Sequence, residues 1–168
     1  MKLQRLLSLI RQAVDQYEMI EEGDHIAIGI SGGKDSLTML YALHGLRRFY
    51  EKHFEIEAIT VDLGFPNFDL SPIQALCDEL GVRYTIVNKL RKGALNQKAL
   101  EMGCNKIAYA HHKDDLIETA MMSLLYEGRF YAFSPVTHLD RTDLTVIRPL
   151  MFVSEADVKG FRNKYQLP

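Results

Sequence analysis

The chain has 168 residues, of which 47% are hydrophobic and 25% are charged, and this suits one globular domain with a sizeable core. Its formal net charge of −2 excludes a strongly basic nucleic-acid-binding protein, so any RNA contact has to come from a local patch. No apolar run approaches the length of a membrane span, and the amphipathic start of the chain differs from a signal peptide, so no membrane partner is expected.

Periodic apolar residues predict the secondary structure in chain order. Leucines and other apolar residues at helical spacing predict an amphipathic N-terminal helix over about residues 1–22. Further helices are expected over residues 36–50, 73–80, 90–102, 114–126 and 154–165, and strands over 25–30, 54–61, 83–87, 106–109 and 145–147. Because strands and helices alternate, we expect a single α/β domain over residues 1–168, with a doubly wound, mostly parallel sheet of about five strands and helices on both faces.

The first predicted strand runs into a glycine turn that ends at a helix. The turn is Ser31-Gly32-Gly33-Lys34-Asp35-Ser36, called here the phosphate loop. Glycines allow backbone N–H groups to approach phosphate, and a helix N-terminus adds unpaired donors and a positive dipole. Lys34 adds a full charge, and Ser31 and Ser36 add hydroxyl groups. Any glycine turn between a strand and a helix contains small residues, but lysine, aspartate and two serines together favour a phosphate site.

The phosphate loop differs from the common nucleotide-binding loops. Only three residues separate Gly29 from Gly33, and Asp35 follows the lysine where a Walker loop has Ser or Thr. The glycine spacing also lacks the dinucleotide-binding pattern. The site therefore belongs to another class of nucleotide-binding protein.

Polar residues follow several predicted strands and are expected to meet at one sheet edge. In a parallel sheet, ligands bind outside the carboxyl ends of the strands. The polar residues found there are the phosphate loop, Asp62, residues 110–115 and Arg148. Their convergence at one edge supports a functional site independently of the loop motif.

The second polar cluster contains His111, His112, Asp114 and Asp115 at a helix start. Asp114 could simply cap the helix, whereas adjacent carboxylates beside a triphosphate site could hold Mg²⁺. A zinc site is not expected, because no cysteine or third histidine lies at ligand spacing. The histidines could contact phosphate or substrate, and one of them could equally be a half-buried turn residue.

The phosphate loop resembles the SGGxDS loop of the N-type ATP pyrophosphatases, the PP-loop family. That resemblance implies cleavage of ATP between the α and β phosphates and activation of a substrate oxygen by AMP. His111-His112-Lys113-Asp114-Asp115, with Glu118-Thr119, and Ile147-Arg148-Pro149-Leu150 resemble segments of the tRNA 2-thiocytidine synthetase group within this family, and residues 91–95 resemble another. Ala110 stands where that group usually has glycine.

The resemblance implies ATP and Mg²⁺ as ligands, tRNA as substrate and specific residue roles. Sulfur would displace AMP after the cytidine C2 oxygen has attacked the α-phosphate. The implied roles are pyrophosphate binding by Ser31, Gly32, Gly33 and Ser36, charge neutralisation by Lys34, loop or metal positioning by Asp35, an adenosine or metal contact by Asp62, ATP contacts by His111 and His112, Mg²⁺ ligation by Asp115, and α-phosphate contact by Arg148.

The chain departs from the thiolating members in its cysteines. Those members resemble one another in three cysteines that bind an iron–sulfur cluster, which thiolate ligands suit. Cys77 and Cys104 do not match those positions, and two lone cysteines fit a core role and a reducing cytoplasm. The alternatives are a trimmed sequence, another nucleophile such as an amine, a sulfur donor in trans, or an ATP- or RNA-binding module without turnover.

Partners are only weakly indicated. Basic residues gather at Arg47, Arg48 and Lys52 and at Lys89, Arg91, Lys92 and Lys98, where they could contact RNA or form ordinary solvated faces. Aromatic residues at 130–133 could stack on a base or form a packed strand edge. The N-terminal helix could form a homodimer or pack on its own sheet.

Overall fold

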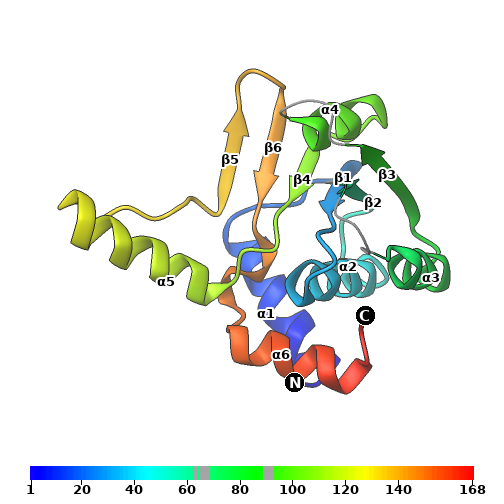
Figure 1. Ribbon diagram of the computed structural model, residues 1–168, viewed down its shortest axis with the longest axis horizontal. Helices are drawn as coiled ribbons and strands as arrows, with labels where there is room; N and C mark the ends of the chain where they lie inside the picture. The colour runs from blue at the N-terminus through cyan, green and yellow to red at the C-terminus, as the bar shows by residue number, and fades with distance from the viewer. Residues whose placement is uncertain (63, 65–68, 89–92) are drawn as a thin grey trace.

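The computed structural model describes residues 1–62, 64, 69–88 and 93–168, which form an α/β fold (Figure 1). The strands are β1 (Asp24–Gly29), β2 (Phe54–Asp62), β3 (Arg83–Asn88), β4 (Lys106–Ala108), β5 (Val136–Leu139) and β6 (Leu144–Ile147). The helices are α1 (Leu3–Gln16), α2 (Lys34–Arg47), α3 (Ser71–Leu80), α4 (Ala94–Glu101), α5 (Lys113–Met122) and α6 (Glu155–Tyr165), with a π-helical turn η1 (Ser123–Glu127) and a 3₁₀ turn η2 (Pro149–Phe152).

The described strands form one six-stranded sheet in the order β3-β2-β1-β4-β6-β5. All pairs are parallel except β5 with β6, which form an antiparallel hairpin. The predicted mostly parallel α/β fold is confirmed, and the expected count of about five strands omitted β5. This strand is short and half-exposed, so its residues lack the continuous apolar run that marks the central strands.

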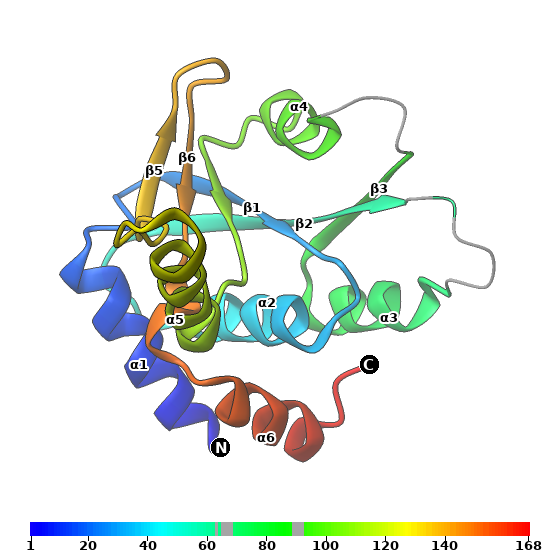
Figure 2. The same ribbon diagram turned by 60° about the vertical axis from the view of Figure 1, so that its left-hand side comes forward.

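Helices cover the two faces unequally. Figure 2 shows α4 on one face and α2 and α3 on the other, with α1 and α6 in a further layer beyond α2. Helix α2 therefore lies between the sheet and another helical layer, and eight of its residues are buried. A helix that is buried on several sides needs apolar residues all round, which explains why its sequence has little amphipathic character.

Several element boundaries differ from the predicted ones. Helix α1 ends at Gln16 because the chain turns there, with Glu18 at a φ of 47°, and buries Met19 and Ile20 completely. Helix α3 begins at Ser71, two residues before the predicted start at residue 73, and the Ser71 N–H donates to Asp69. Gly81 ends that helix at a φ of 63°, a left-handed conformation that favours glycine at a helix C-terminus. The predicted helix start at residues 90–92 lies outside the described residues.

The apolar face of α1 is covered by the same chain. Leu6, Ile10, Ala13 and Val14 are fully buried, and α1 contacts η2 and α2. The helix thus packs within its own chain, against α2 and η2 and not on the sheet, and homodimerisation stays a prediction. Among the described residues, no helix has the length and apolar character needed to cross a bilayer.

One buried ion pair joins β1 to β4 at the end of the sheet opposite the phosphate loop. Asp24 Oδ2 lies 2.7 Å from Lys106 Nζ, and their side chains are 3% and 8% exposed. Lys106 also donates to the Met19 carbonyl at 3.0 Å, and Asn105 donates to the second oxygen of Asp24 at 2.8 Å. Both charged groups thus have partners, as buried charges require.

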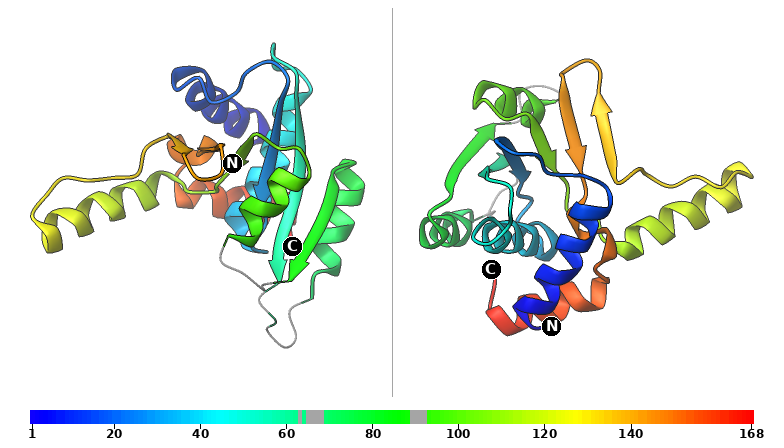
Figure 3. Two further views of the ribbon diagram at one scale, coloured as in Figure 1. Left: turned by 90° about the horizontal axis from the view of Figure 1, so that it is seen from above. Right: turned by 180° about the vertical axis from the view of Figure 1, so that it is seen from behind.

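An arm of the chain stands clear of the sheet. It consists of residues 113–135, in which α5 and η1 run outward and an extended segment returns beside them (Figure 1). Both views in Figure 3 show the same projection. Its apolar side chains include many of the most exposed large ones of the described chain, such as Leu125, Tyr126 and Phe130, at 70%, 78% and 82% exposure. The expected packed strand edge at residues 130–133 is wrong, because this segment forms no strand.

Candidate active site

The polar clusters meet where the strand order of the sheet reverses. β1 continues to β2 on one side, whereas β4 pairs on its other side, so the chain after β1 and the chain after β4 diverge at this point. The crevice outside the carboxyl ends of such neighbouring strands is where open α/β sheets bind ligands. The phosphate loop follows β1, and His111 and His112 follow β4, so both candidate clusters border this crevice.

The phosphate loop is held in shape by its own hydroxyl groups. The buried Ser36 hydroxyl donates to the Gly33 carbonyl at 3.0 Å and accepts the Ser31 N–H at 3.2 Å. Gly32 has a φ of 79°, which favours glycine. Among the described residues no side chain caps α2, so the N–H groups of its first turn lack a capping partner beside the crevice. Backbone donors and the exposed Ser31 are therefore the best placed to bind phosphate, and Ser36 shapes the loop.

Lys34 is held between two carboxylates. Its Nζ lies 3.0 Å from Asp35 Oδ2 and 3.2 Å from Glu155 Oε1 at the start of α6. Burial opposes the charge, but hydrogen bonds with Asp35 and Glu155 outweigh it and raise the pKa of Lys34. Lys34 is thus a firmly cationic group whose present partners could be exchanged for phosphate oxygens.

His112 connects the phosphate loop to α5. Its Nδ1 accepts the Asp115 N–H at 3.4 Å, and Asp115 Oδ2 accepts the His112 N–H at 2.7 Å, so the two residues form a reciprocal cap. The expected cap Asp114 instead accepts the Glu155 N–H at 2.6 Å, which ties α5 to α6. With Nδ1 as acceptor, the proton is assigned to Nε2, which faces Asp35 Oδ1 at 3.7 Å.

The carboxylates beside His112 suit a divalent cation. Asp35 Oδ1 is buried and has no hydrogen-bond partner among the residues that the structure describes. Asp115 uses Oδ2 in its cap, so Oδ1 could bind a cation, and the same imidazole contacts both carboxylates. No group of three His, Cys, Asp or Glu side chains capable of holding a metal occurs in the described ranges. Mg²⁺ commonly takes only one or two carboxylates and completes its shell with water and substrate phosphates, so its binding here stays a prediction.

Arg148 connects the segment after β4 to the segment before β5 by hydrogen bonds. Its Nε donates to His111 Nδ1 at 3.3 Å, and its Nη1 donates to the Ser134 carbonyl at 2.6 Å and to Thr137 at 3.1 Å. These contacts leave Nη2 for the predicted phosphate contact. Arg148 thus also positions His111 and the segment that leads to β5.

Acidification should destabilise the protein through His111. Burial, and then the charge of Arg148, lower the pKa of His111 below its ordinary value of 6.5. The unfolded chain then binds more protons than the native one, so this contribution to stability is present above about pH 6.5 and is lost as the pH falls. We expect the free energy of unfolding, measured in urea at pH 7.5 and 5.5, to fall less in His111→Gln than in the parent.

The matched control for this prediction is His138→Gln, which removes a histidine that is 53% exposed on β5. It should keep the pH dependence of the parent protein. An equal loss of stability on acidification in the parent and in His111→Gln would contradict the assignment.

The remaining predicted residues lie apart from this centre. Asp62 ends β2, on the far side of β1 from β4, and accepts the Gly64 N–H at 2.8 Å. Cys77 and Cys104 are buried in separate hydrophobic clusters, and burial raises the pKa of each to about 11. The expected core role of both cysteines is confirmed, and neither thiol suits an iron–sulfur cluster. Lys89, Arg91 and Lys92 of the predicted basic patch lie outside the described residues.

Two parts of the site were missed from the sequence. In the sequence, Glu155 is only an acidic residue in the first turn of a helix. In the structure it contacts Lys34, which lies more than a hundred residues earlier in the chain. Phe133 lies with its ring 4.9 Å from that of His111, a contact that depends on the path of the arm. Only the folded chain brings these pairs together.

Comparison with known proteins agrees with this arrangement. Residues 4–168 match the PP-loop domain. The chain is 37% identical to the tRNA-cytidine(32) 2-sulfurtransferase of Syntrophotalea carbinolica over 186 residues, covering 98% of this chain and 72% of the relative. The protein of the same name from Geotalea daltonii is 36% identical, with 98% and 74% covered. Since these matches are longer than the 168 residues of this chain, the relatives carry internal residues that it lacks.

A solved structure shares the fold. The U34-tRNA thiolase NcsA from Methanococcus maripaludis, determined with its [4Fe-4S] cluster, superposes with a TM-score of 0.78 at 22% identity. The match covers 98% of this chain and 63% of that one. At this identity the likeness supports the fold alone, and the present chain spans less than two thirds of the structure it resembles.

Proposed function

This chain belongs to the PP-loop domain family, together with the tRNA-cytidine(32) 2-sulfurtransferases, and we propose that it is an ATP-dependent tRNA-modifying enzyme of that type. The resemblance expected from the phosphate loop and from residues 111–119 and 147–150 is thereby confirmed. In the proposed reaction, the C2 oxygen of a tRNA cytidine attacks the α-phosphate of ATP, and pyrophosphate leaves. A sulfur nucleophile then attacks C2, and AMP departs with the original oxygen.

One observation carries the proposal: a chain of contacts crosses the point where the strand order of the sheet reverses. Lys34 contacts Asp35, Asp35 faces His112, and His112 contacts Asp115. The backbone donors of the phosphate loop would bind the departing pyrophosphate, and Lys34 would exchange Glu155 for a phosphate oxygen. Positioned donors and cations provide most of the catalysis in such transfers. Mg²⁺ held by Asp35 and Asp115 would neutralise charge on the phosphates.

The sulfur has to come from a group other than the two thiols of this sequence. Cys77 and Cys104 are buried and poorly ionised, whereas the thiolate is the nucleophilic form of cysteine. We therefore propose a sulfur donor supplied in trans. The proposed site residues Arg148 and His111 would orient the acceptor side of the crevice, and Asp62 would contact the adenosine on the β2 side.

The products of ATP provide the test. With Mg²⁺ and unmodified tRNA, the protein should release AMP and pyrophosphate in equal amounts once a sulfur donor is supplied, and chelation of Mg²⁺ should abolish the release. Nucleoside mass analysis should then identify 2-thiocytidine. Formation of ADP and phosphate would contradict the proposal, as would an amine adduct in place of the thio product. ATP binding without any turnover would identify a binding module.

A further inference from the structure

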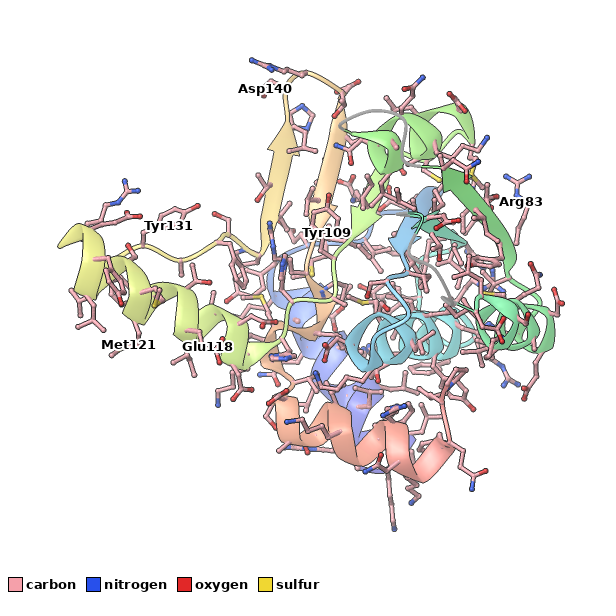
Figure 4. The ribbon with its side chains drawn as sticks, in the orientation of Figure 1. Arg83, Tyr109, Glu118, Met121, Tyr131 and Asp140 are labelled. Carbon is pink, nitrogen blue, oxygen red and sulfur yellow. The ribbon has the colours of Figure 1, made fainter. Side chains whose placement is uncertain are left out.

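A groove of about 620 Å³ opens beside the candidate active site, between α5–η1 and the returning segment of the arm. Its inner end is formed by His111 and Asp115, which also border the crevice, and its outer end by Tyr126 and Tyr131. Its volume lies within the usual range of ligand sites. Figure 4 shows Glu118 on α5 and Tyr131 on the returning segment, the two parts of the arm that border the groove.

The inner aromatic wall is fixed in place. The Phe133 ring lies 4.9 Å from the His111 ring at an interplanar angle of 32°, and the Arg148 guanidinium lies 5.1 Å from the Phe133 centroid. Arg148 also donates to the Ser134 carbonyl at 2.6 Å, which anchors the backbone beside Phe133. The inner end of the groove is therefore already ordered before a ligand enters, which lowers the entropic cost of binding.

The outer wall carries aromatic rings that the chain itself leaves exposed. Tyr126 is 78% exposed and Tyr131 is 52% exposed, and the Arg129 guanidinium lies 5.4 Å from the Tyr131 centroid. Exposed aromatic rings backed by arginine are the usual platforms for unpaired nucleic-acid bases.

One carboxylate in the groove is available to a ligand. Asp115 is engaged in the cap of α5, and Glu127 is paired with Arg129 at 2.6 Å. Glu118, by contrast, makes no ion pair or side-chain hydrogen bond within the part of the chain that the structure describes. A carboxylate accepts hydrogen bonds and donates none, so it selects a base with an exocyclic amino group, as in cytosine N4, over uracil with its O4 acceptor.

We propose that this groove receives the target cytosine, turned out of an RNA loop, with its face against Tyr131 and its amino group donating to Glu118. The inference rests on the proposed function, and it adds the pocket that selects the base. The inner end of the groove meets the crevice at His111 and Asp115, so a base inserted from the arm side reaches the α-phosphate from the side opposite β2 and Asp62.

The test measures RNA binding by the full chain. Two labelled stem–loop RNAs are compared that differ only in one loop base, cytosine or uracil, and their affinities are read by fluorescence anisotropy with ATP and Mg²⁺ present. The parent should bind the cytosine loop about ten-fold more tightly, the discrimination that one well-paired base contact provides. Glu118→Gln should erase or reverse this preference, because an amide also offers a donor to uracil O4.

The ring is tested separately. Tyr131→Ala should weaken binding of both RNAs by about ten-fold, and Tyr131→Phe should restore it, since stacking needs the ring and not the hydroxyl. Glu79→Gln, at an exposed position on α3 away from the groove, is the matched charge control and should bind both RNAs as the parent does. Far-ultraviolet circular dichroism of each variant verifies folding.

The outcomes separate this inference from the proposed function. Equal binding of both loops by the parent, or unchanged discrimination in Glu118→Gln, would overturn the base pocket even if pyrophosphate is released. Unchanged RNA affinity in Tyr131→Ala would do the same and assign the exposed rings to another partner. Cytosine discrimination that depends on Glu118, without pyrophosphate release, would instead retain the pocket and refute adenylation.

Discussion

Lys34→Ala should lower RNA-dependent pyrophosphate release by at least about 10²–10³-fold, the loss typical of removing one charge-stabilising group from such a site. Lys34 is the cation at the N-terminus of α2, and its Nζ is positioned by Asp35 and Glu155 at 3.0 and 3.2 Å. Alanine leaves the loop backbone in place but removes the charge that would meet the departing pyrophosphate. Initial rates of pyrophosphate release at saturating ATP and tRNA measure the effect.

The matched control is Lys159→Ala. Lys159 lies 2.9 Å from the other oxygen of Glu155 and is 57% exposed, so its removal takes a lysine from the same carboxylate without touching the loop. It should keep the parent rate. Both variants should unfold at nearly the parent temperature, because partly exposed ion pairs add little to stability. A Lys34→Ala protein that is as active as Lys159→Ala would remove the phosphate loop from the catalytic site.

Asp24→Asn should destabilise the native state by about 3–5 kcal/mol, the cost of breaking a buried ion pair from one side. The substitution leaves the Lys106 ammonium, which is 8% exposed, with the Met19 carbonyl and the outer carboxylate of Glu21 at 3.6 Å. This pair fastens β1 to β4, whose opposite ends support the two halves of the active site. Urea unfolding at pH 7.5 measures the change in the free energy of unfolding.

Two further variants identify the cause. Glu21 is the outer partner of Lys106, and its own side chain is 73% exposed. Glu21→Gln should therefore leave the free energy of unfolding nearly unchanged. Asp24→Asn combined with Lys106→Met should recover part of the loss, because no unpaired charge then remains buried. If Asp24→Asn unfolds at the same urea concentration as Glu21→Gln, the Asp24–Lys106 ion pair does not stabilise the sheet.

The central sheet and the location of the site could be predicted because local signals and topology agreed. Strands such as β1 carry continuous apolar runs, and parallel strands bring the residues after them to one edge. The meeting of the phosphate loop, through Asp35, with His112 after β4 was therefore predictable from the alternation of strands and helices. The edge hairpin and the end of α1 were missed because both depend on packing. β5 is defined by its pairing with β6, and α1 ends where Met19 turns into the core.

The roles of neighbouring carboxylates could not be assigned from the sequence. Asp114 and Asp115 are equivalent as acidic residues in a first helical turn, and the pattern favoured Asp114 as the cap. In the folded chain, Asp115 accepts the His112 N–H and completes the cap, whereas Asp114 accepts the Glu155 N–H. The two side chains have different partners because consecutive residues lie on different faces of a helix. The role of Arg148 was also incomplete from the sequence, because its side chain donates hydrogen bonds to His111 and to the Ser134 carbonyl.

By itself the sequence determined the chemistry of the chain: an α/β sheet, a phosphate loop at a helix start, paired carboxylates and membership in the PP-loop domain family. The loop and the paired carboxylates are readable from sequence because their residues are close together along the chain, and the sheet is readable because apolar runs alternate with helical patterns. Only the tertiary structure decided which partners those residues have. The contact of Glu155 with Lys34 joins segments that are distant in sequence, and the groove beside Tyr131 depends on the path of the arm. Both arise from packing, which local sequence patterns do not encode.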